Sequence, residues 1–458
     1  MAGESAAEVP EANRLGRLGW ALFKWANQPV FTVITTFIFA PYFSSAVVGD
    51  PVHGQALWAD AQSVAGLCIA LASPFLGAVA DAAGPRKGWT LAFQVLCIAG
   101  CAALWWVRPG GGPQAWFWAL AAVVVLTIGA EISIVFNNAM LPTLVRQDRI
   151  GRLSGFAWGL GYVGGIVSLM LVLLGFSLPA EPWFGLDKAL HENDRIVGPL
   201  VAAWIVVFIL PLFLFTPDQP RSGLGRMAAA RQGVGQLLAT LRRLRHYRNI
   251  ALFLLARMIA YDGLNAVFAF GGIYAAGVFG WGTTSLGIFG IVILVFGVIG
   301  CWIGGWLDDR IGSKPTMQGA VIGVLLATTG ILSMTRQSVL FGIAVDGPAA
   351  GAQGALFAST AERIFMLFGI MIGIFGGPMQ AAARSMMARL APRPLLGQFF
   401  GLYALTGEAT AFFVPLLVGA MTNAFHSQRV GLVPIVVVLA AGFVLMIGVR
   451  EVRAEIAD

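Results

Sequence analysis

The segment GAVADAAGPR (77–86) recurs, with changes, as GWLDDRIGSK (305–314) in the second half of the chain. Both copies carry Gly, Asp, Gly and a basic residue at the same spacing, 228 residues apart. A long apolar run precedes each copy and another follows it. This pattern is typical of a tight turn between two helices that end at a membrane surface, where the carboxylate can bond basic groups or exposed helix N–H groups.

A second repeated set supports a duplication of the whole chain. Residues 246 positions apart match in five places: Met140, Leu144, Gly151, Gly155 and Gly161 recur as Met386, Leu390, Gly397, Gly401 and Gly407. The change of offset predicts an insertion near 337–357, where Asp346-Gly347-Pro348 breaks regular structure. Parallel repeats predict two bundles related by an axis along the membrane normal, with a central cavity that opens alternately to each side.

The composition places these repeats in lipid. Of the 458 residues, 58% are hydrophobic and 11% are charged, whereas about a quarter are charged in soluble proteins. A helix needs about 20 apolar residues to cross a bilayer. The twelve runs of that kind are 18–43, 56–80, 89–107, 115–137, 153–176, 197–216, 250–279, 284–307, 316–334, 362–387, 399–421 and 430–449. The sequence therefore predicts an all-α membrane protein with twelve transmembrane helices in two six-helix bundles.

Basic residues set the expected orientation. The predicted parts are a tail (1–17), a bundle (18–216), a linker (217–249), a second bundle (250–449) and a second tail (450–458). The linker holds seven arginines against one acid, Asp218. Placing both termini in the cytoplasm puts 21 of the 29 Lys and Arg residues on that side and six outside, as cytoplasmic loops require. Residues 1–16 lack the features of a signal peptide, and we expect a bacterial plasma membrane location.

Five ionisable residues lie inside the predicted helices: Lys24, Glu131, Arg257, Asp262 and Glu408. Burying a charge in lipid costs at least ~2.5–3.5 kcal/mol, so such residues usually face a wet pathway. Arg257 and Asp262 are about 140° apart around a helix, and we expect each to pair across the cavity. Asp262 and Glu131 are the first candidates for a proton site, with a structural ion pair as the alternative. Lys24 is expected to extend to the headgroups.

Polar and helix-breaking residues give a second set of candidates. Pro29 is expected to interrupt helix 1, and Gly376-Gly377-Pro378 to interrupt helix 10. Broken helices can expose carbonyl groups to a solute, but they also serve as hinges or packing sites. The residues that can hydrogen-bond a polar solute are Asn27, Gln28, Asn138, Asn265 and Gln380.

The duplicated turn resembles the loops between helices 2 and 3 and between helices 8 and 9 of the major facilitator superfamily. The matching positions are Gly77, Asp81, Gly84, Arg86, Gly305, Asp309, Arg310, Gly312 and Lys314. The resemblance implies a conformational latch that holds the bundles together when the cavity faces outward. Ala82 and Pro85 replace basic residues of the pattern, so the first latch is expected to be weaker. The alternative is a turn that only fixes topology.

The chain is also similar to the "unknown major facilitator" family, which includes the yeast autophagy-related vacuolar amino-acid effluxer. The segments that carry this similarity are Trp25-Ala26-Asn27, Pro41-Tyr42-Phe43, Asn138-Ala139-Met140-Leu141-Pro142, Tyr261-Asp262-Gly263, Phe270-Gly271-Gly272-Ile273-Tyr274, Gly377-Pro378-x-Gln380 and Phe400-Gly401-Leu402-Tyr403-Ala404-Leu405-x-Gly407. The family usually has an acid where this chain has Lys24 and a base where it has Glu408. An exchanged charge pair is one hypothesis for this reversal.

These features predict a secondary active transporter of a small polar solute, working by alternating access. The resemblance implies amino-acid efflux, and buried carboxylates suggest proton coupling. The alternative is a membrane receptor or assembly factor that retains the fold. An enzyme is disfavoured because no nucleophile–base or metal constellation occurs, and no phosphate-binding loop suggests ATP. We therefore expect a solute and membrane lipid as partners, no cofactor, no metal, no nucleic acid, and a monomer.

Overall fold

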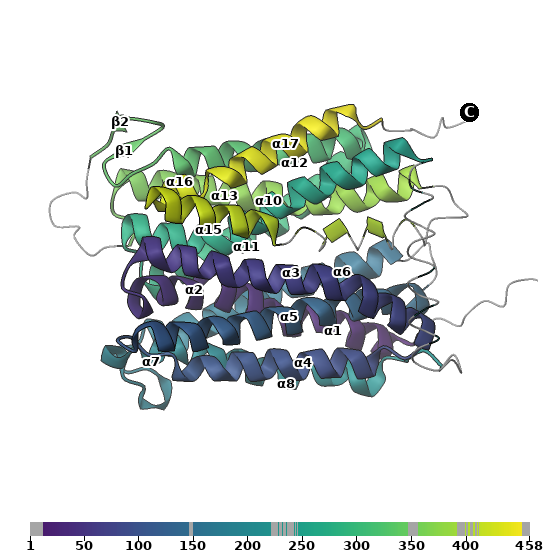
Figure 1. The fold of residues 1–458 in the computed structure, drawn as a ribbon, viewed down its shortest axis with the longest axis horizontal. Coiled ribbons are helices and arrows are strands. Elements are labelled where there is room, and N and C mark those ends of the chain that lie inside the picture. The colour runs from purple at the N-terminus through teal and green to yellow at the C-terminus, as the bar shows by residue number, and fades with distance from the viewer. Residues whose placement is uncertain are drawn as a thin grey trace, which may run out of the picture.

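The computed structural model describes residues 12–145, 150–220, 246–346, 356–391 and 412–450, with isolated positions between these ranges. Within them, the side chains at 73–75, 77–83, 142, 150–152, 154–155, 309 and 388 lie outside the described part. Figure 1 shows two stacks of long helices, with the first half of the chain below and the second half above. We call the end where α17 finishes the terminal end, and the opposite end the distal end.

The first half forms the N-terminal bundle. Its elements are α1 (Arg14–Pro29), a π-helical segment (Val30–Phe37), α2 (Phe39–Tyr42), a second π-helical segment (Phe43–Val47), α3 (Pro51–Ala83), α4 (Lys87–Ala103), α5 (Gly112–Leu144), α6 (Ile150–Val172), α7 (Glu192–Arg195) and α8 (Val197–Phe215), with short 3-10 and π turns between them. The stretch from Arg14 to Val47 forms a single membrane-length helix with local widening.

The second half forms the C-terminal bundle. Its elements are α10 (Arg248–Phe279), α11 (Thr283–Ile311), α12 (Ser313–Leu332), the hairpin of β1 (Ser338–Val339) and β2 (Ile343–Ala344), α13 (Thr360–Leu390), α15 (Phe413–Phe425), α16 (Gln428–Gly431) and α17 (Val433–Gly448). The hairpin occupies the expected insertion between helices 9 and 10, of which residues 347–355 lie outside the described part.

Ten helices in the described part are long and apolar enough to cross a membrane. The 33-residue α3 and the shorter apolar α15 complete two sets of six. Helices of this kind satisfy every backbone group internally, which the hydrocarbon requires. The predicted all-α, twelve-helix, two-bundle fold is confirmed.

Helix 10 is not interrupted at Gly376-Gly377-Pro378, so that prediction is wrong. Helix α13 runs without a break from Thr360 to Leu390. A Cβ on Gly377 would lie 2.3 Å from the Cys301 sulfur, and Pro378 packs where a Cβ on Gly304 would lie 2.4 Å away. The small residues therefore allow α11 and α13 to approach closely, as in many membrane helix pairs.

Helix 1 responds to Pro29 by widening rather than by breaking. The chain changes from α-helix to π-helix directly after this proline. Proline cannot donate to the carbonyl four residues earlier, which belongs to Trp25. The Trp204 indole N–H of α8 donates to that carbonyl at 3.1 Å, and the two indole rings stack at 5.6 Å. Thus no bare carbonyl is left at this point.

Candidate functional site: the interface between the bundles

The bundles are joined by hydrogen bonds at the distal end. Gln55 of α3 donates to the Thr422 hydroxyl at 2.9 Å and to the Gln428 carbonyl at 3.2 Å. Gln428 in turn donates to the Pro51 carbonyl at 2.8 Å. The Thr283 hydroxyl donates to Asp194. All of these bonds lie at the same end of the bundles.

Glycines bring the two bundles into backbone contact beside these bonds. A Cβ on Gly272 of α10 would lie 2.1 Å from the Thr36 carbonyl oxygen in helix 1. A Cβ on Gly290 of α11 would lie 2.6 Å from the Phe37 ring, and one on Gly287 would lie 2.7 Å from Leu173. The structure is therefore closed between the bundles at the distal end. We call this region the distal seam.

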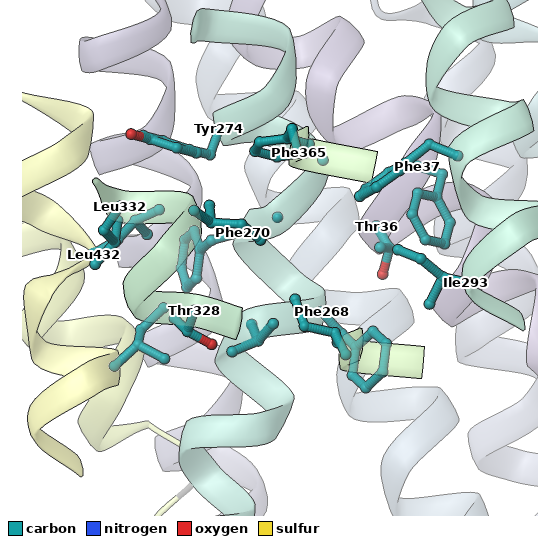
Figure 2. A pocket seen from close by; sticks show the side chains of 17 residues that line it. Thr36, Phe37, Phe268, Phe270, Tyr274, Ile293, Thr328, Leu332, Phe365 and Leu432 are labelled. Atoms are coloured by element: carbon teal, nitrogen blue, oxygen red, sulfur yellow. The ribbon is translucent and has the colours of Figure 1, made fainter. Parts of the chain in front are cut away.

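Figure 2 shows an apolar pocket within the distal seam. Its volume is about 40 Å³, and its walls include Phe37, Phe270, Phe289 and Phe365. This space is sufficient for about one water, and it offers few polar groups. The pocket is therefore part of the closed region and is unsuited to a polar solute.

Toward the terminal end, helix 1 presents a polar stripe to α6. Lys24, Gln28 and Thr32 are spaced by four residues and so share one helix face. Gln28 donates to the Thr32 hydroxyl at 3.1 Å. The Lys24 ammonium lies 4.5 Å from the centre of the Trp158 ring and the residue is buried. The expectation that Lys24 extends to the headgroups is therefore wrong.

Arg384 of α13 approaches the same indole from the other bundle. Its guanidinium lies 5.7 Å from the centre of the Trp158 ring. The neighbouring Tyr162 has its ring 3.9 Å from the position that a Cβ on Gly297 of α11 would take, and its hydroxyl is within electrostatic reach of Arg384 and Tyr261. A tryptophan face attracts cations, so this ring is a point where charges from both bundles converge.

Arg257 and Asp262 both contact the same segment of helix 11. Arg257 donates to the Tyr403 carbonyl at 2.8 Å and to the Thr406 hydroxyl at 3.1 Å, and it stacks 3.6 Å from the Tyr403 ring centre. Asp262 accepts a hydrogen bond from the Thr410 hydroxyl. Both residues are buried. These contacts lie within the C-terminal bundle, which differs from the expected pairing across the cavity.

Asn27 lies away from the interface, inside the N-terminal bundle. Its amide oxygen accepts from Gln94 at 2.8 Å, and Gln94 also donates to Ser133 at 2.6 Å. All three residues are almost fully buried. The set links α1, α4 and α5, which is a packing role and gives no contact with a solute.

The remaining candidates lie on faces that the structure leaves partly open. Glu131 is half-buried on α5, and Asn138 is exposed two turns further along nearly the same face. Asn265 is exposed on α10, one turn from Tyr261, and Gln380 is half-buried one turn before Arg384 on α13. Glu408 lies outside the described residues, so its relation to Lys24 stays a prediction.

The two repeated turns have matching structures. Gly84 and Gly312 adopt φ values of 99° and 101°, a region that favours glycine. The Lys87 ammonium donates to the Phe213 carbonyl at 3.0 Å, and the Lys314 ammonium donates to the Ile447 carbonyl at 3.0 Å. Each lysine thus binds the end of the last helix of its own bundle. The structural match is Lys87 with Lys314, one position from the sequence pairing with Arg86.

Carboxylates stabilise these turns from positions that the motif did not indicate. Asp218 of the linker accepts from the backbone N–H groups of Arg86 and Lys87 at 2.8 and 3.1 Å, which places a negative charge at the start of α4. Asp308 accepts from Ser313, the first residue of α12, at 2.5 Å and lies 3.4 Å from Arg389. Each carboxylate therefore acts at the beginning of the helix that follows the turn.

Two further residues of the second turn lie at the surface of α11. Arg310 stacks on Trp306, and Gly305 is exposed. The side chains at the Gly77, Asp81 and Asp309 positions lie outside the described part of the chain. The bonds of Lys87 and Lys314 stay within one bundle each. A latch between bundles therefore remains a prediction.

Sequence reasoning misses Arg384 and Asp60. The charge count places Arg384 with the basic residues of the following loop, although its spacing of four from Gln380 puts both on one face of a helix. Asp60 lies in α3, and its Oδ1 atom is 3.0 Å from the position that a Cβ on Gly419 of the other bundle would take. A closer count of charges within the predicted helices would find both.

A histidine–carboxylate pair lies at the distal end of the N-terminal bundle. The Nδ1 atom of His191 is 2.9 Å from Asp194 Oδ2, and the other carboxylate oxygen accepts from Thr283 of the C-terminal bundle. The hydrogen bond with Asp194 raises the pKa of His191 above its ordinary value of 6.5, against an opposing effect of burial and of Arg195. Protonation of His191 therefore favours this arrangement.

We expect the His191 contribution to stability to depend on pH. Because the folded-state pKa is raised, the contribution is fully present below pH ~6.5 and is lost as pH rises through the folded-state pKa. The effect should be no more than about 1 kcal/mol since the ring is partly exposed. Thermal unfolding between pH ~5.5 and ~8.5 measures it. The His191→Asn variant should lose this pH dependence, and an identical pH profile would contradict the assignment.

Similarity to known proteins agrees with the architecture. An uncharacterized MFS-type transporter, YxiO of Bacillus subtilis, is 24% identical over 446 residues, covering 94% of each chain. Autophagy-related protein 22-1 of Neosartorya fischeri is 26% identical over 317 residues, which is 66% of this chain and 49% of that protein. The chain thus spans about half the length of this fungal relative. A crystal structure of a D-xylose-proton symporter superposes with a TM-score of 0.64 at 14% identity, covering 95% and 97% of the two chains.

Fold and relatives together define a multi-pass membrane transporter of the major facilitator superfamily, of the secondary type. Within that class, residues 45–457 match the family described as vacuole effluxer Atg22 like, and the chain belongs to this family.

Proposed function

We propose that the chain transports a small polar solute with a carboxylate group through the interface between the bundles. The observation that carries the proposal is the approach of Lys24 and Arg384, one from each bundle, to the single ring of Trp158. A carboxylate between these cations would interact with both bundles at once. Solute binding would then be felt by both halves of the protein, which alternating access requires.

The distal seam supports alternating access. It consists of a few hydrogen bonds and close glycine contacts, with no salt bridge among the described residues that join the bundles. Each such hydrogen bond contributes about 0.5–1.5 kcal/mol net. A barrier of this size can be broken and remade in each cycle. The duplicated turns at the terminal end are the corresponding candidates for closing the other side.

Proton coupling would use Asp262. The carboxyl is buried in the membrane-spanning part of α10 and bonds Thr410 of helix 11. A buried carboxylate can take up a proton when its surroundings change. Its bond to helix 11 would connect protonation to movement of that helix. Glu131, half-buried on α5, is the second candidate.

Amino acids are the solute class that we propose, because the family description names vacuole effluxers and the proposed site has two cations for a carboxylate. We further propose that the protein acts as a monomer in a bacterial plasma membrane, with bundles 18–216 and 250–449 and with the terminal end in the cytoplasm. The excess of Lys and Arg at that end supports the orientation.

Reconstitution into liposomes tests the proposed function. The purified chain is assayed with labelled amino acids and short peptides, with and without a pH gradient. Saturable flux of an amino acid that the gradient increases would support the proposal. Absence of flux for every solute, with protein shown to be folded, would favour a receptor or assembly factor with the same fold.

Arg384→Gln should raise the KM for a carboxylate-bearing solute. A hydrogen bond to a charged group contributes about 1.5–3 kcal/mol, which predicts at least a ~10-fold change. Arg363→Gln is the matched control, because Arg363 is exposed near the start of the same helix α13 and bonds only backbone carbonyls in the structure. Equal KM values for the two variants would exclude Arg384 from the solute site.

A further inference from the structure

A second cavity, of about 390 Å³, opens at the distal end beside the seam. Small-molecule sites commonly have volumes of about 300–1,000 Å³. Its walls come mainly from the C-terminal bundle, including Arg336, His426, Gln428 and Arg429, while Val52 belongs to the N-terminal bundle. Gln428 is also the residue that bonds the Pro51 carbonyl across the seam. The cavity therefore has its full wall only when the bundles meet at this end.

The cavity has a positive lining. Arg336 and Arg429 contribute two permanent charges, His426 adds a titratable one, and none of the described residues that line it is acidic. The Arg336 Nε group is fixed by the Val278 carbonyl near the end of α10, which leaves its terminal nitrogens available. No hydrogen-bond acceptor for the Arg429 guanidinium is found in the described part of the chain. Guanidinium groups bind carboxylates and phosphates through paired hydrogen bonds.

A buried hydroxyl at the cavity wall lacks a partner. Tyr274 is 1% exposed, and its hydroxyl has no hydrogen bond within the described residues. The group is within electrostatic reach of Arg429. Figure 2 shows this hydroxyl pointing away from the rings of Phe270 and Phe365. Leaving a buried polar group unpaired costs about 1–3 kcal/mol, so a ligand oxygen at this point would remove that penalty.

We propose that this cavity binds a small anion with a phosphate or carboxylate group, held by Arg336, Arg429 and Tyr274. The anion stabilises the state that is closed at the distal end, because the wall is complete only in that state. By linkage, a ligand shifts an equilibrium toward the state that it binds more tightly. The site is separate from the solute pathway and regulates the cycle from the distal side, beyond the transport activity itself.

Titration with inorganic phosphate tests the site. We expect a saturable rise in the thermal unfolding temperature of the purified protein at constant ionic strength. The double variant Arg336→Gln/Arg429→Gln should bind phosphate at least ~10-fold more weakly, since each charged hydrogen bond contributes strongly. Arg108→Gln, at an exposed position of the same end, should bind like wild type. Tyr274→Phe should weaken binding without destabilising the phosphate-free protein, because its hydroxyl bonds nothing in the described part of the chain.

A distance measurement checks the coupling to the seam and the source of the anion. Spin labels at Arg108 and Gln337, exposed on different bundles at the distal end, should show a larger short-distance population with phosphate. Nanodiscs with phosphatidylglycerol, compared with phosphatidylcholine alone, show whether a lipid headgroup has the same effect. A response to either anion that the double variant lacks supports the proposal. Absence of a saturable response to both, or the same response in the double variant, would overturn it.

Discussion

Gly272→Ala should prevent closure of the distal seam and reduce transport at least ~10-fold, because overpacking costs about 1–3 kcal/mol and about 1.4 kcal/mol corresponds to a factor of ten. The added Cβ would lie 2.1 Å from the Thr36 carbonyl oxygen, whereas non-bonded heavy atoms prefer separations of about 3.5 Å or more. Both groups are held by the backbone of their helices. The contact is therefore relieved mainly by separation of the bundles.

The adjacent glycine provides the control for this prediction. A Cβ on Gly271 would meet nothing within 4 Å, so Gly271→Ala should transport like wild type. Spin labels at Arg108 and Gln337, in a background without the four native cysteines, report the state of the seam. The Gly272→Ala protein should show longer distances than the Gly271→Ala protein. Unchanged distances and normal flux would mean that this glycine contact does not limit closure.

Asp262→Asn should abolish accumulation driven by a pH gradient while retaining exchange of labelled for unlabelled solute. Asparagine has nearly the same shape and can still accept a hydrogen bond from Thr410, so the local packing should survive. It cannot take up a proton in the relevant range. Exchange requires only that the loaded carrier reorients, whereas gradient-driven accumulation requires a proton to bind and leave in each cycle.

Asp308→Asn is the matched control for Asp262. This carboxylate is also buried in the C-terminal bundle, and it bonds Ser313 and Arg389 at the terminal end. Its replacement should lower stability but preserve the response to the pH gradient. Gradient-driven accumulation by the Asp262→Asn protein would exclude this residue as the proton site and direct attention to Glu131.

The helices and the duplication were predictable because hydrocarbon imposes strong rules on sequence. Length and apolarity identify spans, and repeated turns such as Gly84 and Gly312 require a backbone conformation that leaves a residue signature. The exact partners were less predictable. The pairing of Lys87 with Lys314 differs by one position from the sequence alignment, since a lysine side chain is long enough to reach its carbonyl from either neighbouring position.

The candidate site was harder to predict because side-chain direction depends on how neighbouring helices rotate. Asn27 and Gln28 are adjacent in sequence, yet Asn27 bonds Gln94 inside the N-terminal bundle while Gln28 faces α6. Arg384 lies within a helix that continues several residues past the predicted end. The effect of Pro378 depended on the glycines of α11, which allow a straight helix to pack closely around it.

The bond from the Trp204 indole to the Trp25 carbonyl has a consequence for how the protein moves. It fastens the first and sixth membrane helices to each other at the level where proline weakens the first one. Helix 1 cannot bend there independently without exposing a carbonyl to hydrocarbon. The N-terminal half should therefore swing as a rigid body, with its pivot in the contact surface between the halves.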